Sequence, residues 1–350
     1  MAIYAYLFDA ESQDRQVKFD SPTVEAVGNK QLLWVDVSGD KTEELQKVVD
    51  LLALSDTLVQ TMRSDDGSLR QSLRPRLDLY ANCFHVSIES IQSREDTNEK
   101  SGSSGVKNGA RNQPTAFRIV LVHFIVFANV VISLHEQPAT FLESFDTRIK
   151  GDTHFGDLDG PAFLGALLNW HITGYFRALE TLEIEVDRID DAALRRRRGR
   201  EERDLLAEMV KVRRRLALVR RTLLPHREVY ATLARPRFAH FVTEHATETL
   251  QLVAERMERS IEATENAREL VLGSFDIFTT QTALKTNEVV KILTILSAIL
   301  LPAGVIATLA TLVIRGPVYD FGRLGFWEVL ASMVLIAIIF VVVARKRNWV

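Results

Sequence analysis

The sequence has almost no cysteine, since Cys83 is the only one among 350 residues. One cysteine excludes a disulfide framework within the chain, which is compatible with a reducing compartment. We expect Cys83 to be a small buried residue of a strand and not a reactive thiol. Residues 1–11 also lack the basic stretch, long apolar core and cleavage site of a secretory signal peptide, so we expect none.

The short motifs of common enzyme classes are missing as well. The sequence contains no glycine-rich phosphate loop, nucleophile elbow or paired-histidine metalloprotease helix. Its eight histidines are dispersed, and His123 and His135, on or near strands, fit a structural role better than a metal-binding one. We therefore expect a protein that is not an enzyme and needs no cofactor.

Charge is absent from one long stretch near the carboxyl end. Residues 292–314 contain no charged side chain, and a helix of that length reaches about 35 Å, more than the ~30 Å hydrocarbon core of a bilayer. A second apolar run, 324–344, contains one charged residue, Glu328. Near its start lie Phe326 and Trp327, aromatic residues of the kind found at membrane interfaces. We predict two transmembrane helices joined by a periplasmic loop, 315–323. The alternative is a buried helical core of a soluble protein.

Basic residues near these runs predict their orientation. The loop carries two arginines, Arg315 and Arg323, whereas more basic residues flank the outer ends. These are Lys285, Lys291, Arg345, Lys346 and Arg347. Because cytoplasmic flanks are enriched in Lys and Arg, both termini should face the cytoplasm, including the basic tail 345–350. The predicted location is a bacterial-type inner (plasma) membrane.

Residues 1–236 predict a cytoplasmic α/β domain with a helical second half. Short segments rich in β-branched and aromatic residues predict strands; they are 3–8, 32–37, 84–91, 117–124 and 125–134. The polar Ser-, Gly- and Asn-rich residues 92–114 predict a flexible loop. Beyond Pro138, apolar residues recur at three- and four-residue spacing, which is typical of helices.

Four consecutive arginines, 195–198, predict a helix end or turn, and basic residues continue to Arg221. Three interpretations of this basic run are open: a solvated surface that pairs with acids, contact with anionic lipid headgroups, and nucleic-acid binding. The chain has a net charge of −3, and neither interleaved aromatics nor a recognition motif accompanies the run. We therefore expect no nucleic-acid partner.

Residues 237–291 predict a stalk helix. No proline and only one glycine, Gly273, occur from Phe238 to Lys291, and about fifty helical residues would extend for roughly 80 Å. This helix should continue directly into the first transmembrane helix. It would therefore transmit changes between the cytoplasmic domain and the membrane part.

Polar and small residues gather on one side of the first transmembrane helix, in two rows with seven-residue spacing. The rows are Asn287, Thr294, Leu301 and Thr308, and Val290, Ser297, Gly304 and Thr311. We call these eight positions the polar face. It predicts either helix packing through small residues or a water-filled pore closed by an apolar ring at Leu293 or Leu301. Two helices cannot enclose a pore, so a pore would require several subunits around an axis.

Five segments near the carboxyl end carry a family resemblance: 276–278, 287–294, 301–302, 306–307 and 345–349. Over about sixty carboxyl-terminal residues the chain resembles the CorA-type magnesium and divalent-cation transporters. The resemblance implies a homopentameric funnel with an α/β/α cytoplasmic domain, a stalk helix and a two-helix transmembrane hairpin. It implies passive passage of a divalent metal ion, Mg²⁺ or Zn²⁺, and offers Glu255 and Asp276 as candidate metal-binding residues. The pore roles that it implies fall to Asn287, Val290, Thr294, Leu301, Gly304 and Thr308.

The chain departs from this family at the outer end of the first transmembrane helix. Thr311, Leu312 and Val313 replace the family's Gly-Met-Asn signature, and Arg315 follows. These four residues would form the pore mouth, where Val313 offers no side-chain oxygen to a hard cation and arginines favour anions. On the stalk, Leu252 occupies the position at which the family has a regulatory acidic residue. Three functions thus stay open: a divalent-cation channel, a non-conducting sensor or regulatory scaffold, and an anion-selective or tension-gated channel.

Overall fold

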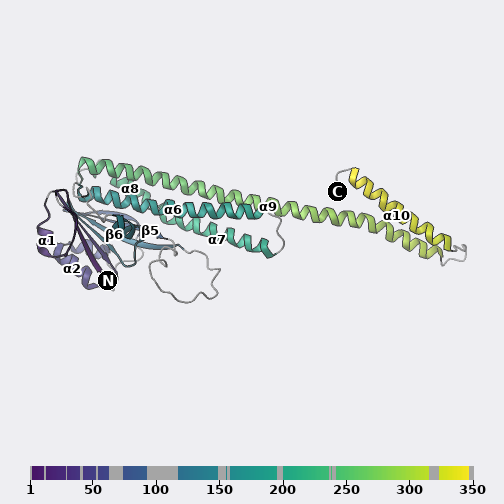
Figure 1. Ribbon diagram of the computed structural model, residues 1–350, viewed down its shortest axis with the longest axis horizontal. Coiled ribbons are helices and arrows are strands. Elements are labelled where there is room, and N and C mark those ends of the chain that lie inside the picture. The colour runs from purple at the N-terminus through teal and green to yellow at the C-terminus, as the bar shows by residue number, and fades with distance from the viewer. Residues whose placement is uncertain are drawn as a thin grey trace. The chain divides into compact units, whose positions relative to one another are not determined.

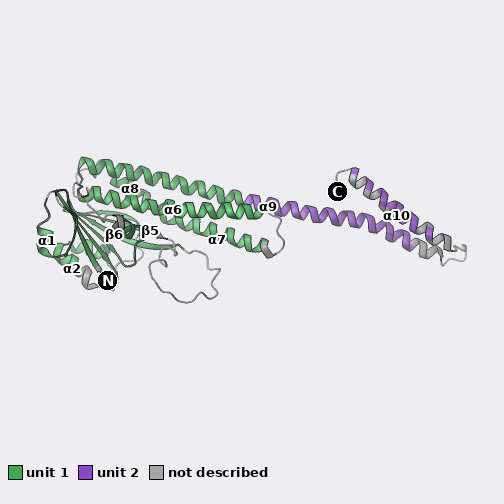
Figure 2. Ribbon diagram, viewed as in Figure 1, with its two compact units in different colours: residues 1–274 green, residues 275–350 purple. Residues whose placement is uncertain are grey.

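The computed structural model describes most of the chain, with gaps. The described residues are 2–11, 13–28, 30–39, 42–52, 54–62, 74–92, 117–148, 155, 158–194, 200–235, 238, 242–314 and 323–346. The chain divides into two compact units, residues 1–274 and 275–350 (Figure 2). The predicted loop 92–114 beyond Gln92, the arginines 195–198, the loop 315–323 before Arg323 and the tail after Lys346 lie outside the described residues.

Seven strands form one mixed sheet in the first unit. They are β1 (Ala2–Asp9), β2 (Arg15–Val17), β3 (Gln31–Ser38), β4 (Arg76–Leu79), β5 (Phe84–Gln92), β6 (Arg118–Val126) and β7 (Val130–His135). Their order in the sheet is β2-β1-β3-β7-β6-β5-β4. Only β3 and β7 pair in parallel among these strands.

The sheet contains all five predicted strands, but one boundary differs. The apolar run 117–134 does not break after Phe124, because β6 continues to Val126 and the turn lies at Ala128 and Asn129. The Phe127 N–H donates to the Val130 carbonyl across that turn, at 2.8 Å. Strands β2 and β4 were not predicted, since they are short and polar and lie at the two sheet edges.

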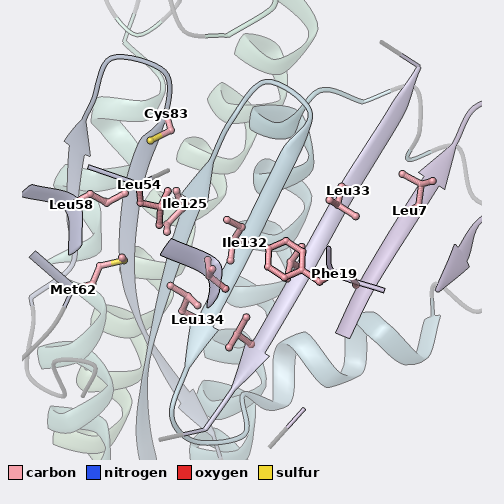
Figure 3. Packing of buried hydrophobic residues seen from close by; sticks show 14 residues of the cluster. Leu7, Phe19, Leu33, Leu54, Leu58, Met62, Cys83, Ile125, Ile132 and Leu134 are labelled. Carbon is pink, nitrogen blue, oxygen red and sulfur yellow. The ribbon is translucent and has the colours of Figure 1, made fainter. Parts of the chain in front are cut away.

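Helices cover both faces of the sheet, which gives the predicted α/β/α layering (Figure 1). On one face lie α1 (Ser21–Glu25), α2 (Thr42–Leu52) and α3 (Asp56–Met62). Leu58 and Met62 of α3 pack there against Ile125 and Leu134 of the strands, as Figure 3 shows. On the other face, the Trp34 ring lies edge-on to the ring of Phe145 in α5 (Thr140–Arg148), with 5.7 Å between the ring centroids.

Three long helices of the first unit bury residues at alternating three- and four-residue spacing, the heptad pattern of coiled-coil packing. They are α6 (Gly160–Leu194), α7 (Arg200–Leu223) and α9 (Glu244–Ile314), with the short α8 (His226–Leu233) between the last two. The buried seam of α9 runs through Ala246, Leu250, Val253, Met257, Ser260, Thr264, Ala267, Val271 and Ser274, and Ile261 is buried beside it. The equivalent seam of α7 runs through Leu205, Met209, Val212, Leu216, Val219 and Leu223.

Helix α9 begins at Glu244, seven residues after the predicted start of the stalk. The Thr243 hydroxyl accepts the Ala246 N–H at 3.2 Å, the usual capping bond of a helix amino terminus. The same helix continues through Pro302 to Ile314, so stalk and first predicted span are one helix.

The second unit contains the rest of α9 and α10 (Arg323–Lys346). Among the described residues, α9 is the one helix long and apolar enough to cross a membrane, and none of its apolar segment is buried. Burial of that segment would be expected if it were a core helix of a soluble protein. The second predicted transmembrane helix coincides with α10, many of whose side chains lie outside the described residues.

Candidate functional site

One side of α9 is anchored to α6, α7 and α8 in the first unit. The Arg256 guanidinium donates to the amide oxygen of Asn169 and, at 3.1 Å, to the Thr173 hydroxyl. Near the end of the buried seam, the Ser274 hydroxyl donates to the Asp190 carboxylate at 2.9 Å. Two ion pairs add to these bonds; they are Arg220–Glu265 and Arg227–Glu258. The anchored side therefore has identified partners within the chain.

The polar face is exposed at every position whose side chain the structure describes. These positions are Asn287, Val290, Thr294, Ser297, Leu301, Gly304 and Thr308. Leu301, at 70% exposure, is the most exposed large apolar residue among those described. The half-buried residues of the same stretch follow a different stripe: Ile295, Ala298, Ile299, Pro302, Ala303 and Ile306. The described residues of the second unit thus leave the polar face uncovered.

Threonine hydroxyls of the polar face have a defined orientation. Thr294 donates its proton to the Val290 carbonyl and Thr308 to the Gly304 carbonyl, each at 2.8 Å. A hydroxyl has one proton and two lone pairs, so a threonine in this geometry presents acceptor lone pairs to its surroundings. Such oxygens suit cations and the hydrogens of water.

Two glycines of α9 lie in open space among the described residues. A Cβ added at Gly273 or at Gly304 would meet no atom within 4 Å. Glycine inside a helix costs roughly 0.5–1 kcal/mol relative to alanine. No close contact in the described part of the chain accounts for either glycine.

Carboxylates continue one row of the polar face towards the amino end of α9. Counting back from Val290 in sevens gives Ala283 and then Asp276 in the second unit, followed by three glutamates in the first. These four carboxylates are Asp276, Glu269, Glu262 and Glu255, all of them exposed. Such a row keeps to one face of a supercoiled helix and drifts by about 20° per heptad around a straight one. Arg259 is the one base in the adjoining row from Leu252 to Thr280.

The other candidate residues have different surroundings. Leu293 is 61% exposed but belongs to neither row, so Leu301 is the gate candidate that lies on the polar face. Thr311, Leu312 and Val313 belong to α9, but their side chains, like Arg315, lie outside what the structure describes. Within the described residues, no group of three or more His, Cys, Asp or Glu side chains could hold a metal ion, and this includes Glu255 and Asp276.

The strand histidines and the cysteine lie in the interior of the sheet domain. His123 Nδ1 lies 3.0 Å from His85 Nε2, whose other ring nitrogen contacts Asp78 at 3.2 Å. His135 contacts Asp36 at 3.2 Å; burial lowers the pKa of His135, but its bond to Asp36 and the charge of Asp36 outweigh this, and the pKa is raised. Burial raises the pKa of the Cys83 thiol to about 11, so the thiol is not activated at neutral pH.

Sequence reasoning found the polar face but not the carboxylates Glu262 and Glu269 that precede it. The available signal was the seven-residue spacing itself, extended backwards from Val290. This spacing was hard to recognise because a long solvated helix usually carries many acidic residues. Two others on the same helix, Glu258 and Glu265, do form ion pairs with arginines.

Comparison with known proteins agrees with this architecture. A family model for CorA-like Mg²⁺ transporter proteins matches residues 29–346. A cobalt/magnesium transport protein, CorA of Thermotoga maritima, is 22% identical over 323 residues, which cover 90% of this chain and 83% of that protein. The complete structure of the CorA magnesium transporter of Methanocaldococcus jannaschii matches over 100% of both chains, with a TM-score of 0.73 and 18% identity. The full-length CmaX protein matches over 99% of this chain and 97% of its own, with a TM-score of 0.67 and 20% identity.

Proposed function

Because this chain belongs to the CorA-like Mg²⁺ transporter family, we propose that it carries divalent cations, Mg²⁺ or Zn²⁺, passively through a membrane pore lined by α9. Members of the family are ion transporters and not enzymes. The ion is the transported substrate and no cofactor takes part. Cobalt and magnesium are named for the T. maritima relative, which supports a divalent ion here.

The observation that carries this proposal is the exposure of the polar face. Within the proposed span this face carries the hydroxyl oxygens of Thr294, Ser297 and Thr308, and a polar oxygen in hydrocarbon loses the hydrogen bonds that it would accept from water. The described positions of the opposite stripe are half-buried, whereas those of this face are exposed. Water in a pore would satisfy these groups, and Leu301 would supply a dewetting constriction between them.

Cations are favoured over anions by two features of the helix. The back-bonded hydroxyls of Thr294 and Thr308 present lone pairs, which accept from the water shell that Mg²⁺ releases reluctantly. The carboxylate row from Glu255 to Asp276 would concentrate cations ahead of the pore. Five copies would bring twenty such carboxylates around one axis.

The enclosure of a pore requires a homo-oligomer, and we propose a pentamer with α9 inside and α10 towards the lipid. A cyclic assembly lets identical helices face a common axis. Gly273 and Gly304, where an added Cβ would meet no described atom within 4 Å, would allow a close approach of adjacent α9 helices or widen the lumen.

The proposed topology places the protein in a bacterial-type inner membrane with both termini in the cytoplasm. Residues 1–236 form the cytoplasmic α/β domain and 237–291 the stalk. Residues 292–314 and 324–344 span the membrane, with 315–323 as the periplasmic loop and 345–350 as the tail. The bias of basic residues towards the outer ends supports this orientation.

Ion uptake into sealed liposomes that contain the full-length protein tests the proposal. Mg²⁺, Zn²⁺, K⁺ and Cl⁻ are compared in wild type, in Leu301→Ser and in Leu300→Ser. Both leucines are exposed in the same helix, but only Leu301 belongs to the polar face. We expect uptake of a divalent cation that rises several-fold in Leu301→Ser and is unchanged in Leu300→Ser, because a polar ring keeps the constriction wet.

Two results would contradict the proposal. Absence of flux for every ion in all three proteins would favour a non-conducting regulatory scaffold, consistent with the Thr311, Leu312 and Val313 replacement. A preference for Cl⁻ would favour an anion channel whose selectivity is set at Arg315.

A further inference from the structure

Strand β5 has an edge that β4 covers only in part. Residues Phe84–Ser87 of β5 pair with β4, and the pairing stops there. Two residues further on, Glu89 carries backbone groups that no described strand on this side satisfies. An open strand edge with unpaired peptide groups is a liability in any sheet, and proteins cover such edges.

Histidine and tyrosine side chains from two helices take the place of the missing strand. The Glu89 N–H donates to Nε2 of His226 in α8, at 3.0 Å. The Glu89 carbonyl accepts from the Tyr175 hydroxyl at 2.7 Å and lies 2.9 Å from Nε2 of His171, both in α6. Nδ1 of His171 lies 2.8 Å from the Tyr230 hydroxyl. We call His171, Tyr175, His226 and Tyr230 the edge cluster.

The bonding pattern fixes the protonation of both histidines. Nε2 of His226 accepts a backbone N–H, so it carries no proton, and its Nδ1–H faces the Thr222 carbonyl at 2.9 Å. Nε2 of His171 must carry a proton, since a carbonyl only accepts. A second proton on His171 could be accommodated by rotation of the Tyr230 hydroxyl. A second proton on His226 could not, because it would point at the Glu89 N–H.

We propose that His226 is an acid-sensitive latch on the edge of β5: a proton on its Nε2 removes the acceptor of the Glu89 N–H and lets this edge separate from α8. The latch couples proton concentration to the attachment between the sheet and the helices of the first unit. It does not depend on the proposed transport function.

Burial and the neighbouring His171 favour the neutral form of His226, and they outweigh the bonds of its Nδ1–H to the Thr222 and Leu223 carbonyls, which favour the charged form. All four side chains of the edge cluster are fully or almost fully buried. Burial lowers the pKa of His226 well below its usual range, and the nearby His171 ring, 5.0 Å away, lowers it further. Burial also lowers the pKa of His171, to about 4.

Three further groups face the edge cluster. Phe141 of α5 lies edge-on to His171 and carries no charge. Burial raises the pKa of the half-buried Glu89 carboxyl, while the charge of Arg221 in α7 opposes that rise. Besides the two histidines, the Glu89 carboxyl is the group here whose pKa is shifted towards mild acid, and it requires its own control.

Hydrogen exchange of the full-length protein, followed by mass spectrometry of peptides from residues 84–92, measures the opening of this edge. Rates at pH 7.5 and pH 5.0 are corrected for intrinsic exchange. An exposed histidine has a pKa of about 6.5. If one histidine is protonated only in the open state, the equilibrium constant for opening should be about 30-fold larger at pH 5.0 than at pH 7.5. Peptides from residues 31–38 of the central strand β3 should keep their protection, and a return to pH 7.5 should restore β5.

Three variants separate the contributions. His226→Gln offers a non-titrating amide oxygen in place of Nε2, so the acid response should disappear. Glu89→Gln, which retains the backbone groups, and His245→Gln, at an exposed site on α9, should both respond as the wild type does.

Unchanged protection of β5 at pH 5.0 in the wild type would overturn the proposal without any variant. Equal loss of protection in β3 and β5 would also overturn it, since that indicates general acid unfolding. An undiminished acid response in His226→Gln, or its disappearance in Glu89→Gln, would assign the response to another group.

Discussion

The close approach of α6 and α9 at Gly165 gives a sharp prediction about stability. A Cβ added at Gly165 would lie 2.7 Å from Cγ2 of Thr249, well inside the ~3.5–4.0 Å of an ordinary carbon contact. Rotation of Thr249 is hindered because its hydroxyl donates to the His245 carbonyl at 3.1 Å. Gly165→Ala should therefore force the two helices apart locally.

The magnitude follows from two opposing effects. Overpacking costs about 1–3 kcal/mol. Alanine recovers roughly 0.5–1 kcal/mol of helix propensity. The net loss should lie between about 0 and 2.5 kcal/mol, which lowers the thermal midpoint of a domain of this size by up to roughly 10 °C.

Gly174 on the same helix provides the matched control. A Cβ there would meet only the Ile91 carbonyl at 3.8 Å, an ordinary contact, so Gly174→Ala should raise the midpoint slightly. The double variant Gly165→Ala/Thr249→Ser lacks the methyl group that clashes and should return to the wild-type midpoint or exceed it. Thermal unfolding followed by intrinsic fluorescence measures all three, because Trp34 and Trp170 lie in this unit. If Gly165→Ala were as stable as Gly174→Ala, the helices would not approach as closely as described.

Three more predictions concern the same unit. Asp159 accepts hydrogen bonds from the Ala162 N–H at 2.8 Å and from the Thr243 hydroxyl at 2.6 Å. Asp159→Ala should therefore lower the free energy of unfolding in urea by about 2 kcal/mol, whereas Asp159→Asn should retain most of the cap. Equal effects of the two variants would contradict this dual role. Cys83 is buried with its pKa raised to about 11, so N-ethylmaleimide should modify it slowly in the folded protein and rapidly in urea, and fast native labelling would show an exposed thiol. Arg256→Met keeps an apolar stem but loses both guanidinium bonds to α6, and thermal unfolding should show a loss of about 1–2 kcal/mol, with no loss if the anchor is dispensable.

Local pattern was sufficient to predict the main elements of this fold. The strands 3–8, 32–37 and 84–91 lie within β1, β3 and β5, because each is an apolar, β-branched run long enough to exceed the noise of single residues. The run 292–314 lies within α9, as predicted, because 23 consecutive residues without a charge are also a strong local signal. Edge strands β2 and β4 carry little apolar signal, since they have few core contacts to make.

Long-range partners could not be predicted from sequence. The bond between Glu89 and His226 joins residues 137 positions apart, and nothing near either residue specifies the other. The capping role of Asp159 towards Thr243 has the same character, because it depends on two helix ends that meet only after folding. The exposure of the polar face was likewise open, since the pattern fitted helix packing as well as a pore.

The most direct test of the proposed pathway uses the adjacent residues Ser297 and Ala298. Ser297 is exposed on the polar face and Ala298 lies in the half-buried stripe, and cysteine is close in size to both. The only native cysteine, Cys83, is buried, so an introduced cysteine supplies the accessible thiol for the reagent. In liposomes we predict that a cationic methanethiosulfonate modifies Ser297→Cys faster than an anionic one and reduces divalent-cation uptake, while Ala298→Cys neither reacts nor changes uptake. Protection of Ser297→Cys, or its modification without any effect on uptake, would contradict a cation pathway along this face.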